Sequence, residues 1–154
     1  MDPELTRARF DRDVRPLLVN PTTYQQAGLR LIEASYPHLV VSLAWRTRGC
    51  EILLKVDATD WDYLPPKGWW ISEDGAVLVA GQQRVPNGYG FQIGSNVYGE
   101  IQCWFCFPGW REYHNHPGHL QPPWAYYRGR TGYRLMGIVA QLQADLNKPE
   151  VMPV

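Results

Sequence analysis

The spacing of apolar residues predicts a helix at the start of the chain. Phe10, Val14, Leu17 and Leu18 recur at the three- and four-residue intervals of one helical face. Pro16 has no backbone N–H and its ring crowds the preceding turn, so it should kink or shorten this helix near its end. A short amphipathic helix is therefore expected within the first twenty residues.

Two further helices are predicted, one early and one at the C-terminus. The early helix covers 22–35, because a threonine can cap its start and Tyr36-Pro37 stops it. Its apolar positions are Leu29, Leu31 and Ile32. The C-terminal helix has the clearer pattern, with intervals of three and four before Asn147-Lys148-Pro149 ends it. Its apolar residues are Leu135, Ile138, Val139, Leu142 and Leu146.

Alternating residues predict an antiparallel hairpin between these helices. Apolar side chains recur at every second position from His38 to Trp45 and from Glu51 to Asp57. Arg46 to Gly49 supplies a short polar connection, so the two strands should pair directly. Further strands are predicted over Ala76–Ala80 and Gly99–Phe107.

Two stretches lack any regular period. The first, 81–99, is rich in Gly, Asn and Pro, and the second, 108–130, is richer still in Pro, Gly and aromatic residues. We expect both to be ordered irregular loops, and long aromatic loops of this kind often carry function. The predicted fold class is α+β, with N-terminal helices, an antiparallel sheet of about four strands, a long irregular segment and a C-terminal helix.

Composition narrows the picture to one domain without a strong charge. A chain of 154 residues with 45% hydrophobic residues can bury one substantial core, so residues 1–154 are expected to form a single domain. Fifteen basic residues balance fifteen acidic ones, which disfavours nucleic acid and anionic membranes as partners. The apolar runs are too short for a signal peptide or membrane span, so a cytoplasmic protein is expected. Three cysteines in a reducing compartment would remain thiols.

One segment resembles a known family. From Asp57 to Trp70 the chain reads Asp-Ala-Thr-Asp-Trp-Asp-Tyr-Leu-Pro-Pro-Lys-Gly-Trp-Trp, which is similar to the Thr-Asp-Tyr-Pro turn and Pro-Pro pair of ubiquitin-conjugating (UBC) enzymes. Thr131 to Pro149 resembles the helix that follows the catalytic cysteine in that family. The order of the predicted elements agrees. The resemblance implies a UBC-like fold and a conjugating enzyme that carries a modifier as a cysteine thioester.

The residues around the cysteines depart from the family pattern. Conjugating enzymes carry His-Pro-Asn before the cysteine, whereas here the histidines of 114–119 follow Cys103 and Cys106. The set Cys106, Glu112, His114 and His116 instead resembles a bacterial family predicted to bind metal, whose operons encode ubiquitin-like proteins, activating enzymes and JAMM-type peptidases. Both resemblances imply a bacterial ubiquitin-like pathway, with the modifier and an adenylating activating enzyme as partners. Some such operons act in antiphage defence.

If the protein is a conjugating enzyme, Cys106 is the preferred nucleophile and Cys103 is the alternative. Phe107-Pro108-Gly109 should leave the thiol of Cys106 at a strand exit, and on a regular strand the two cysteines point to opposite faces. Nearby imidazolium groups of His114 and His116 would lower the pKa of the thiol. Asn115 could stabilise an oxyanion, and Glu112 could orient a histidine or deprotonate the attacking amine. Cys50 is expected to be a buried apolar residue.

Zinc is the main alternative. Cys103-x-x-Cys106 with three histidines offers up to five ligands, and tetrahedral zinc needs three or four. The candidate ligands are Cys103, Cys106, His114, His116 and His119. This interpretation makes the protein a non-catalytic, zinc-stabilised UBC-like adaptor that binds the modifier. The two hypotheses differ in whether a thioester ever forms; the first needs no cofactor.

Overall fold

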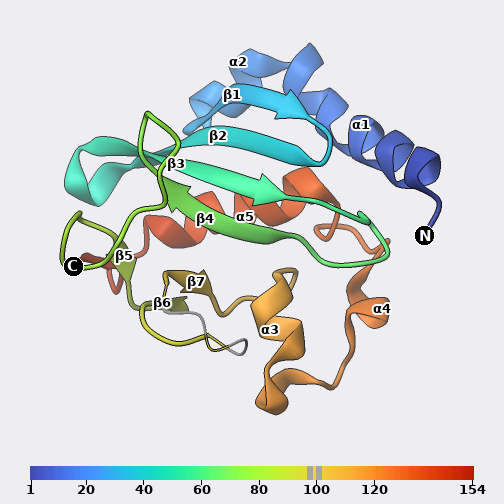
Figure 1. Ribbon diagram of the computed structural model, residues 1–154. Helices are drawn as coiled ribbons and strands as arrows, with labels where there is room; N and C mark the ends of the chain where they lie inside the picture. Colours follow the sequence, from blue (N-terminus) through green and yellow to red (C-terminus); the bar gives the residue numbers. More distant parts are fainter. Residues whose placement is uncertain (97–98, 100–101) are drawn as a thin grey trace.

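A four-stranded antiparallel sheet forms the centre of the fold (Figure 1). The computed structural model describes residues 1–96, 99 and 102–154. The strands follow one another in the order β1-β2-β3-β4, so each pairs with its neighbour in sequence. Their bounds are Leu29–Ser35 for β1, His38–Trp45 for β2, Cys50–Asp57 for β3 and Lys67–Ile71 for β4. The predicted hairpin of β2 and β3 is confirmed, and a 3-10 turn, η1 (Arg46–Arg48), connects the two strands.

Helices flank this sheet at both ends of the chain. α1 (Pro3–Val19) and α2 (Pro21–Gln26) precede it, and α5 (Leu135–Leu146) lies across one of its faces (Figure 1). The predicted α+β order of N-terminal helices, four strands, an irregular segment and a C-terminal helix is confirmed. In the part of the chain that the structure describes, no helix combines the length and the apolar character needed to cross a membrane.

Short elements make up the structure between the sheet and α5, and one more short strand follows α5. The strand pairs are β5 with β8 and β6 with β7. The elements are β5 (Pro86–Asn87), β6 (Phe91–Gln92), β7 (Trp104–Phe105), α3 (Arg111–Asn115), η2 (Pro117–His119), α4 (Trp124–Tyr127) and β8 (Met152–Pro153). Turns and bends join them, so the irregular character predicted for 81–99 and 108–130 is confirmed for the described residues.

The N-terminal helix forms as its apolar pattern predicts. The side chain of Asp2 accepts a hydrogen bond from the backbone N–H of Glu4, which caps the first turn. Phe10, Val14 and Leu17 are buried, whereas Leu18 lies on the exposed side. Pro16 sits inside the last turn and the helix still reaches Val19. Three of the four predicted positions therefore form the buried face.

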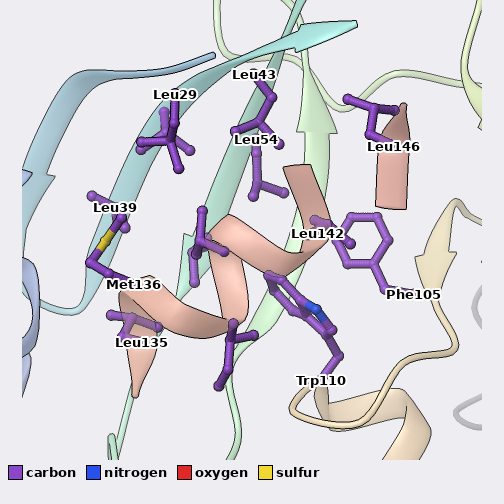
Figure 2. Close-up of a cluster of buried hydrophobic side chains, with 14 of the residues drawn as sticks. Leu29, Leu39, Leu43, Leu54, Phe105, Trp110, Leu135, Met136, Leu142 and Leu146 are labelled. Carbon is purple, nitrogen blue, oxygen red and sulfur yellow. The ribbon is translucent and has the colours of Figure 1, made fainter. Parts of the chain in front are cut away.

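The core lies between α5 and the sheet. Figure 2 shows Leu142 and Leu146 of α5 close to leucines of the sheet, with Phe105 and Trp110 approaching from the irregular segment. Leu39, Leu43 and Leu54 are fully buried, and so are Leu135 and Leu146. Because Phe105 and Trp110 are buried in the same cluster, the irregular segment packs on the core that the regular elements form.

The predicted early helix is wrong. α2 ends at Gln26, and Leu29–Ser35 is strand β1, which pairs with β2. Gly28 has a positive φ of 91°, a conformation that ends a helix. Leu29 and Leu31 pair with residues of β2, so tertiary pairing overrides the local helical spacing.

Two predicted strands also need correction. Within Ala76–Ala80, Val77 and Ala80 form isolated bridges, and the fourth strand is instead Lys67–Ile71. The chain does turn at Asp74-Gly75, but the residues from Ala76 to Ala80 form only isolated bridges and no continuous strand pairing. Within Gly99–Phe107, the described strand is limited to Trp104–Phe105, and residues 100 and 101 of this prediction lie outside the described residues.

Candidate functional site

The Asp57–Trp70 segment forms a turn between β3 and β4 that two indole groups hold in place. Trp61 is fully buried, and its Nε1 donates a hydrogen bond of 2.8 Å to the carboxylate of Asp13 in α1. Trp124 of α4 donates from its Nε1 to the carbonyl oxygen of Asp62 at 3.0 Å. The turn is thereby fixed to the N-terminal helix on one side and to the irregular segment on the other.

The carboxylate of Asp13 joins three parts of the chain. Besides the indole of Trp61, it accepts from Arg12 at 2.7 Å and from Arg134, just before α5, at 3.3 Å. The side chain of Asp13 is almost completely buried, so these charge-assisted bonds compensate for its desolvation.

Arg111 attaches helix α3 to the same turn. Its backbone N–H donates to the carbonyl oxygen of Pro66 at 2.9 Å, and its Nε donates to that of Pro65 at 3.2 Å. Prolines cannot donate a backbone hydrogen bond, but their carbonyls remain acceptors. The Pro-Pro pair therefore positions α3, the helix that carries Glu112, His114 and Asn115.

The three cysteines differ sharply in exposure. Cys103 is 4% exposed and belongs to the hydrophobic core, whereas Cys106 is half-buried just after β7. The backbone N–H of Cys106 donates to the carbonyl of Gly90 at 2.8 Å, which fixes the strand exit. Cys50 is exposed, so its predicted burial is wrong. It is the first residue of β3, directly after the turn at Gly49, and lies at the end of the strand beyond the buried residues Ile52, Leu54 and Val56.

Burial controls the acidity of both candidate thiols. It raises the pKa of Cys103 and the pKa of Cys106 above the ordinary cysteine value. The expected lowering of the thiol pKa by imidazolium groups is therefore wrong for this structure. At neutral pH both side chains remain mainly protonated thiols.

His114 is a structural acceptor within the site. Its side chain is 6% exposed, and its Nε2 accepts a hydrogen bond of 2.8 Å from the backbone N–H of Gly109. A neutral imidazole that accepts at Nε2 carries its proton on Nδ1. Burial, with a smaller effect of His119, lowers the pKa of His114 to about 4. His114 is thus uncharged at neutral pH and holds the loop that follows Cys106.

The other residues predicted for the site lie in different surroundings. Glu112 is completely buried, so its carboxylate does not face the solvent from which an acceptor amine would approach. Asn115 is exposed at the end of α3. His116 accepts from the backbone N–H of Gly118 through its Nδ1 and caps η2. His119 stacks on Tyr113, with ring centroids 4.1 Å apart.

Sequence reasoning missed a group of tyrosines around His114. The ring centroids of Tyr127 and Tyr133 lie 4.9 Å apart, and the ring centroid of Tyr127 is 5.1 Å from that of His114. The pKa of Tyr113 is raised, first by burial and then by its neighbours Tyr127, Cys106 and Tyr133. The signal in the sequence was the tyrosine content of 113–133, but nothing in the spacing shows which rings meet.

Two cavities adjoin α3. The larger, about 480 Å³, lies between the Pro-Pro turn, α3 and α4. It is lined by Tyr63, Leu64, Pro65, Arg111, His114, Asn115, Leu120, Pro123, Trp124, Ala125 and Arg128. The smaller, about 340 Å³, is lined by Ser95, Asn96, Trp104, Asn115, His116 and Pro117. Asn115 borders both cavities.

The candidate zinc ligands lie in different surroundings, and among the described residues no group of three or more Cys, His, Asp or Glu side chains is placed to hold a metal ion. Cys103 belongs to the core, and Nε2 of His114 is occupied by Gly109. Within the Cys, Glu, His and His set, Glu112 is completely buried and the Nδ1 of His116 accepts a hydrogen bond from the backbone N–H of Gly118.

Comparisons with known proteins add one relative. No protein family model matches the chain. The chain is similar to the uncharacterized protein y4jH of Sinorhizobium fredii (strain NBRC 101917 / NGR234), with 25% identity over 156 positions that cover 84% of this chain and 76% of the relative.

Proposed function

We propose that this protein is a ubiquitin-conjugating-like transferase that carries a bacterial ubiquitin-like modifier as a thioester on Cys106. The observation that carries the proposal is a half-buried thiol at the exit of β7, next to an α3 that is bonded to a Pro-Pro turn. The four-stranded meander and the long C-terminal helix have the order that the resemblance to conjugating enzymes implies. The partners would be the modifier, an adenylating activating enzyme and a target protein.

Burial favours Cys106 over Cys103 as the carrier. A thioester carrier must be reached by the thiol of another protein and then by the acceptor. Cys103 is packed in the core, so acylation there would require the core to open. Cys50 is exposed, but it begins β3 at the turn after η1, far along the chain from the α3 segment.

The surrounding residues serve mainly to shape the loop at Cys106. His114 holds the Gly109 N–H, and Arg111 holds the Pro-Pro carbonyls. Since burial raises the pKa of Cys106, the thiolate fraction at neutral pH is small and transthiolation should accelerate as pH rises above 7. Transfer of the acyl group from one cysteine sulfur to another is nearly balanced in free energy, so exposure and orientation matter more than driving force.

The test is a thioester assay with purified components. The protein is incubated with ATP, the modifier and the activating enzyme from the same genome, and then separated on a non-reducing gel. We expect an adduct that thiol reagents remove and that Cys106→Ala abolishes. Cys103→Ala and Cys50→Ala serve as matched controls and should retain it.

Other outcomes would change the assignment of the nucleophile or of the function. Loss of the adduct only in Cys103→Ala would move the nucleophile to that residue. Absence of any adduct in the unmodified protein, together with one zinc ion bound per chain, would favour the non-catalytic adaptor.

A further inference from the structure

Two buried hydrogen-bond donors border the larger cavity beside α3, and neither has a partner among the described residues. His114 is 6% exposed, and its Nδ1 is unbonded while its Nε2 accepts from Gly109. The Nη2 of Arg111 is also buried and unbonded, although the Nε of the same guanidinium donates to Pro65. Both side chains line the cavity of about 480 Å³. Because an unbonded buried donor costs free energy, an acceptor brought by a ligand would stabilise both groups.

The two donors lie on one face of the same helix. Arg111 and His114 are three residues apart in α3, and side chains at this interval are neighbours on a helix surface. The two nitrogens of the His114 ring point in different directions, and the one directed to Gly109 points to a residue that does not line the cavity. A single acceptor group in the cavity can therefore meet both donors.

The charges around the cavity favour an anion. Arg111 and Arg128 line it, and none of the described residues that line it is Asp or Glu. The carboxylate of Asp62, which does not line the cavity, lies 3.6 Å from Arg128 and 3.8 Å from Arg9, so two arginines share one acidic group. Arg111 adds a further positive charge, and it forms no ion pair with a described residue.

The remaining lining restricts what kind of anion fits. Most of it is apolar, with Leu64, Pro65, Pro123 and Trp124 among the lining residues. A carboxylate has two oxygens, which match the two unbonded donors. A phosphate group would bring further charged oxygens against apolar side chains, where they would lose their hydration without a partner. The volume is in the range of cavities that bind small organic molecules.

We propose that this cavity binds an organic carboxylate, whose oxygens accept from Nδ1 of His114 and Nη2 of Arg111 while its apolar part lies against Leu64 and Trp124. The inference goes beyond the proposed function, because Cys106 does not line the cavity. A free acid and the C-terminal carboxylate of a peptide share this chemistry.

Titration with phenylacetate tests the site, because this probe joins a carboxylate to one apolar ring. Binding to the isotope-labelled protein is followed by the shifts of amide and indole N–H resonances in NMR spectra. We expect saturable shifts at the Nε1–H of Trp124, with a dissociation constant of about 1 mM for a ligand of this size. Phenylacetamide has the same shape without the charge and should bind at least about 10-fold more weakly.

Substitutions at the cavity separate charge from shape. Ala125 is exposed and lines the cavity, so Ala125→Glu places a like charge beside the ligand and should weaken phenylacetate binding at least about 10-fold. Ala125→Gln has the same shape without the charge, and Ala140→Glu lies at an exposed position of α5 outside the cavity. Both controls should bind within about threefold of the unmodified protein.

Arg111→Lys tests the guanidinium itself. Lysine keeps the positive charge but lacks the forked donors, so the dissociation constant should rise about threefold or more. Circular dichroism shows whether this variant folds. If it does not fold, Ala125→Glu against Ala125→Gln decides, and equal affinities of those two variants would overturn the proposal.

Further probes identify the source of the carboxylate and the results that reject the site. Tighter binding of N-acetyl-leucyl-phenylalanine than of phenylacetate would identify a peptide C-terminus as the source, and the reverse order would identify a free acid. Acetate that binds as tightly as phenylacetate, or benzylphosphonate that binds more tightly, would overturn the proposal. Absence of saturable shifts up to about 20 mM phenylacetate would overturn it as well.

The proposed function is judged independently. Cys106→Ala should bind phenylacetate as the unmodified protein does, because Cys106 lies outside the cavity lining. A chain that forms the modifier thioester but does not bind phenylacetate disproves only the carboxylate site. A chain that binds phenylacetate but never forms the thioester disproves only the conjugating function.

Discussion

The sheet with α5 and the segment from residue 81 to 134 are built in different ways. In β3, the buried residues Ile52, Leu54 and Val56 alternate with more exposed ones, and in α5 the buried residues follow the helical period. Among the described residues of 81–134, the buried side chains follow no period and include the polar residues Glu112 and His114. Periodic apolar burial therefore organises the regular half, the sheet with α5, whereas the irregular half, 81–134, also depends on single hydrogen bonds such as that from Gly109 to His114.

Both regions bury polar groups, but they hold them differently. The regular elements bury Ser42, Gln143 and Asp145 within a periodic pattern that fixes the buried face. The irregular half holds polar groups through single bonds, such as those from Gly109 to His114 and from Arg111 to the Pro-Pro pair. Both halves still share one hydrophobic core through Phe105 and Trp110, as Figure 2 shows.

The largest expected effect tests whether the two halves depend on each other. Trp110 is buried against Phe105, with ring centroids 4.9 Å apart. Trp110→Ala should lower the free energy of unfolding by about 3–5 kcal/mol, the usual cost of removing a buried tryptophan side chain. Urea denaturation followed by circular dichroism measures it.

Leu120→Ala is the control for that measurement. Leu120 lies in the same segment but is 53% exposed, so its loss should change the stability by less than about 0.5 kcal/mol. Two separate unfolding transitions in the unmodified protein would contradict a shared core.

The second effect is the pH dependence that His114 imposes. Its pKa of about 4 in the folded protein lies below the ordinary value of 6.5, so protonation favours the unfolded chain. The contribution of uncharged His114 to the free energy of unfolding is fully present above about pH 6.5. The free energy of unfolding should fall by roughly 3 kcal/mol as the pH drops through 4. Urea unfolding at several pH values between 7 and 4 measures the slope of the free energy of unfolding against pH.

His114→Gln should flatten that slope, because glutamine can accept from the Gly109 N–H without titrating. His38→Gln, at an exposed position of β2, is the matched control and should leave the slope as it is. An unchanged slope in His114→Gln would mean that other groups cause the acid sensitivity.

The third effect ranks the thiols by exposure. Iodoacetamide should alkylate Cys50 first, Cys106 more slowly and Cys103 last. Cys103 should react on the order of 100-fold more slowly than Cys50, because its alkylation requires opening of the core. Peptide mapping by mass spectrometry after timed quenching measures the three rates. Equal rates for Cys103 and Cys106 would remove the distinction on which the choice of nucleophile depends.

The smallest effect compares two glycines with positive φ. At Gly109 an added Cβ would meet Ile138 at 3.1 Å, whereas at Gly81 the space around it is empty. Gly81→Ala should cost about 1 kcal/mol from backbone strain, and Gly109→Ala about 2 kcal/mol or more because the packing against α5 adds to it. Thermal unfolding of the two variants gives the difference in destabilisation. Equal destabilisation would mean that the side chain of Ile138 moves aside without a cost in free energy.

Sequence patterns predicted the regular half better than the irregular one. The bounds of β2 and the buried face of α5 follow from local periodicity. Leu29, Leu31 and Ile32 fitted a helix as well as a strand, and only pairing with β2 decides between them.

The sequence singled out a candidate segment, but it could not give the contacts within it. The density of Cys, Glu and His residues in 103–119 directed attention to the segment that contains β7 and α3. Which side chains turn inward depends on bonds between distant residues, such as that between Arg111 and Pro65. For the same reason, the sequence could not show that His114 would be uncharged or that Tyr127 would lie against it.

The bonds of Arg111 also restrict how the Pro-Pro turn can respond to a partner. Tyr63 and Leu64 are exposed directly before two prolines whose φ angles are fixed by their rings. Both proline carbonyls are bonded to the first residue of α3. A protein that displaces Tyr63 or Leu64 must therefore shift α3 as well or break these two bonds, so contact at this outer turn is transmitted mechanically to the loop that His114 holds.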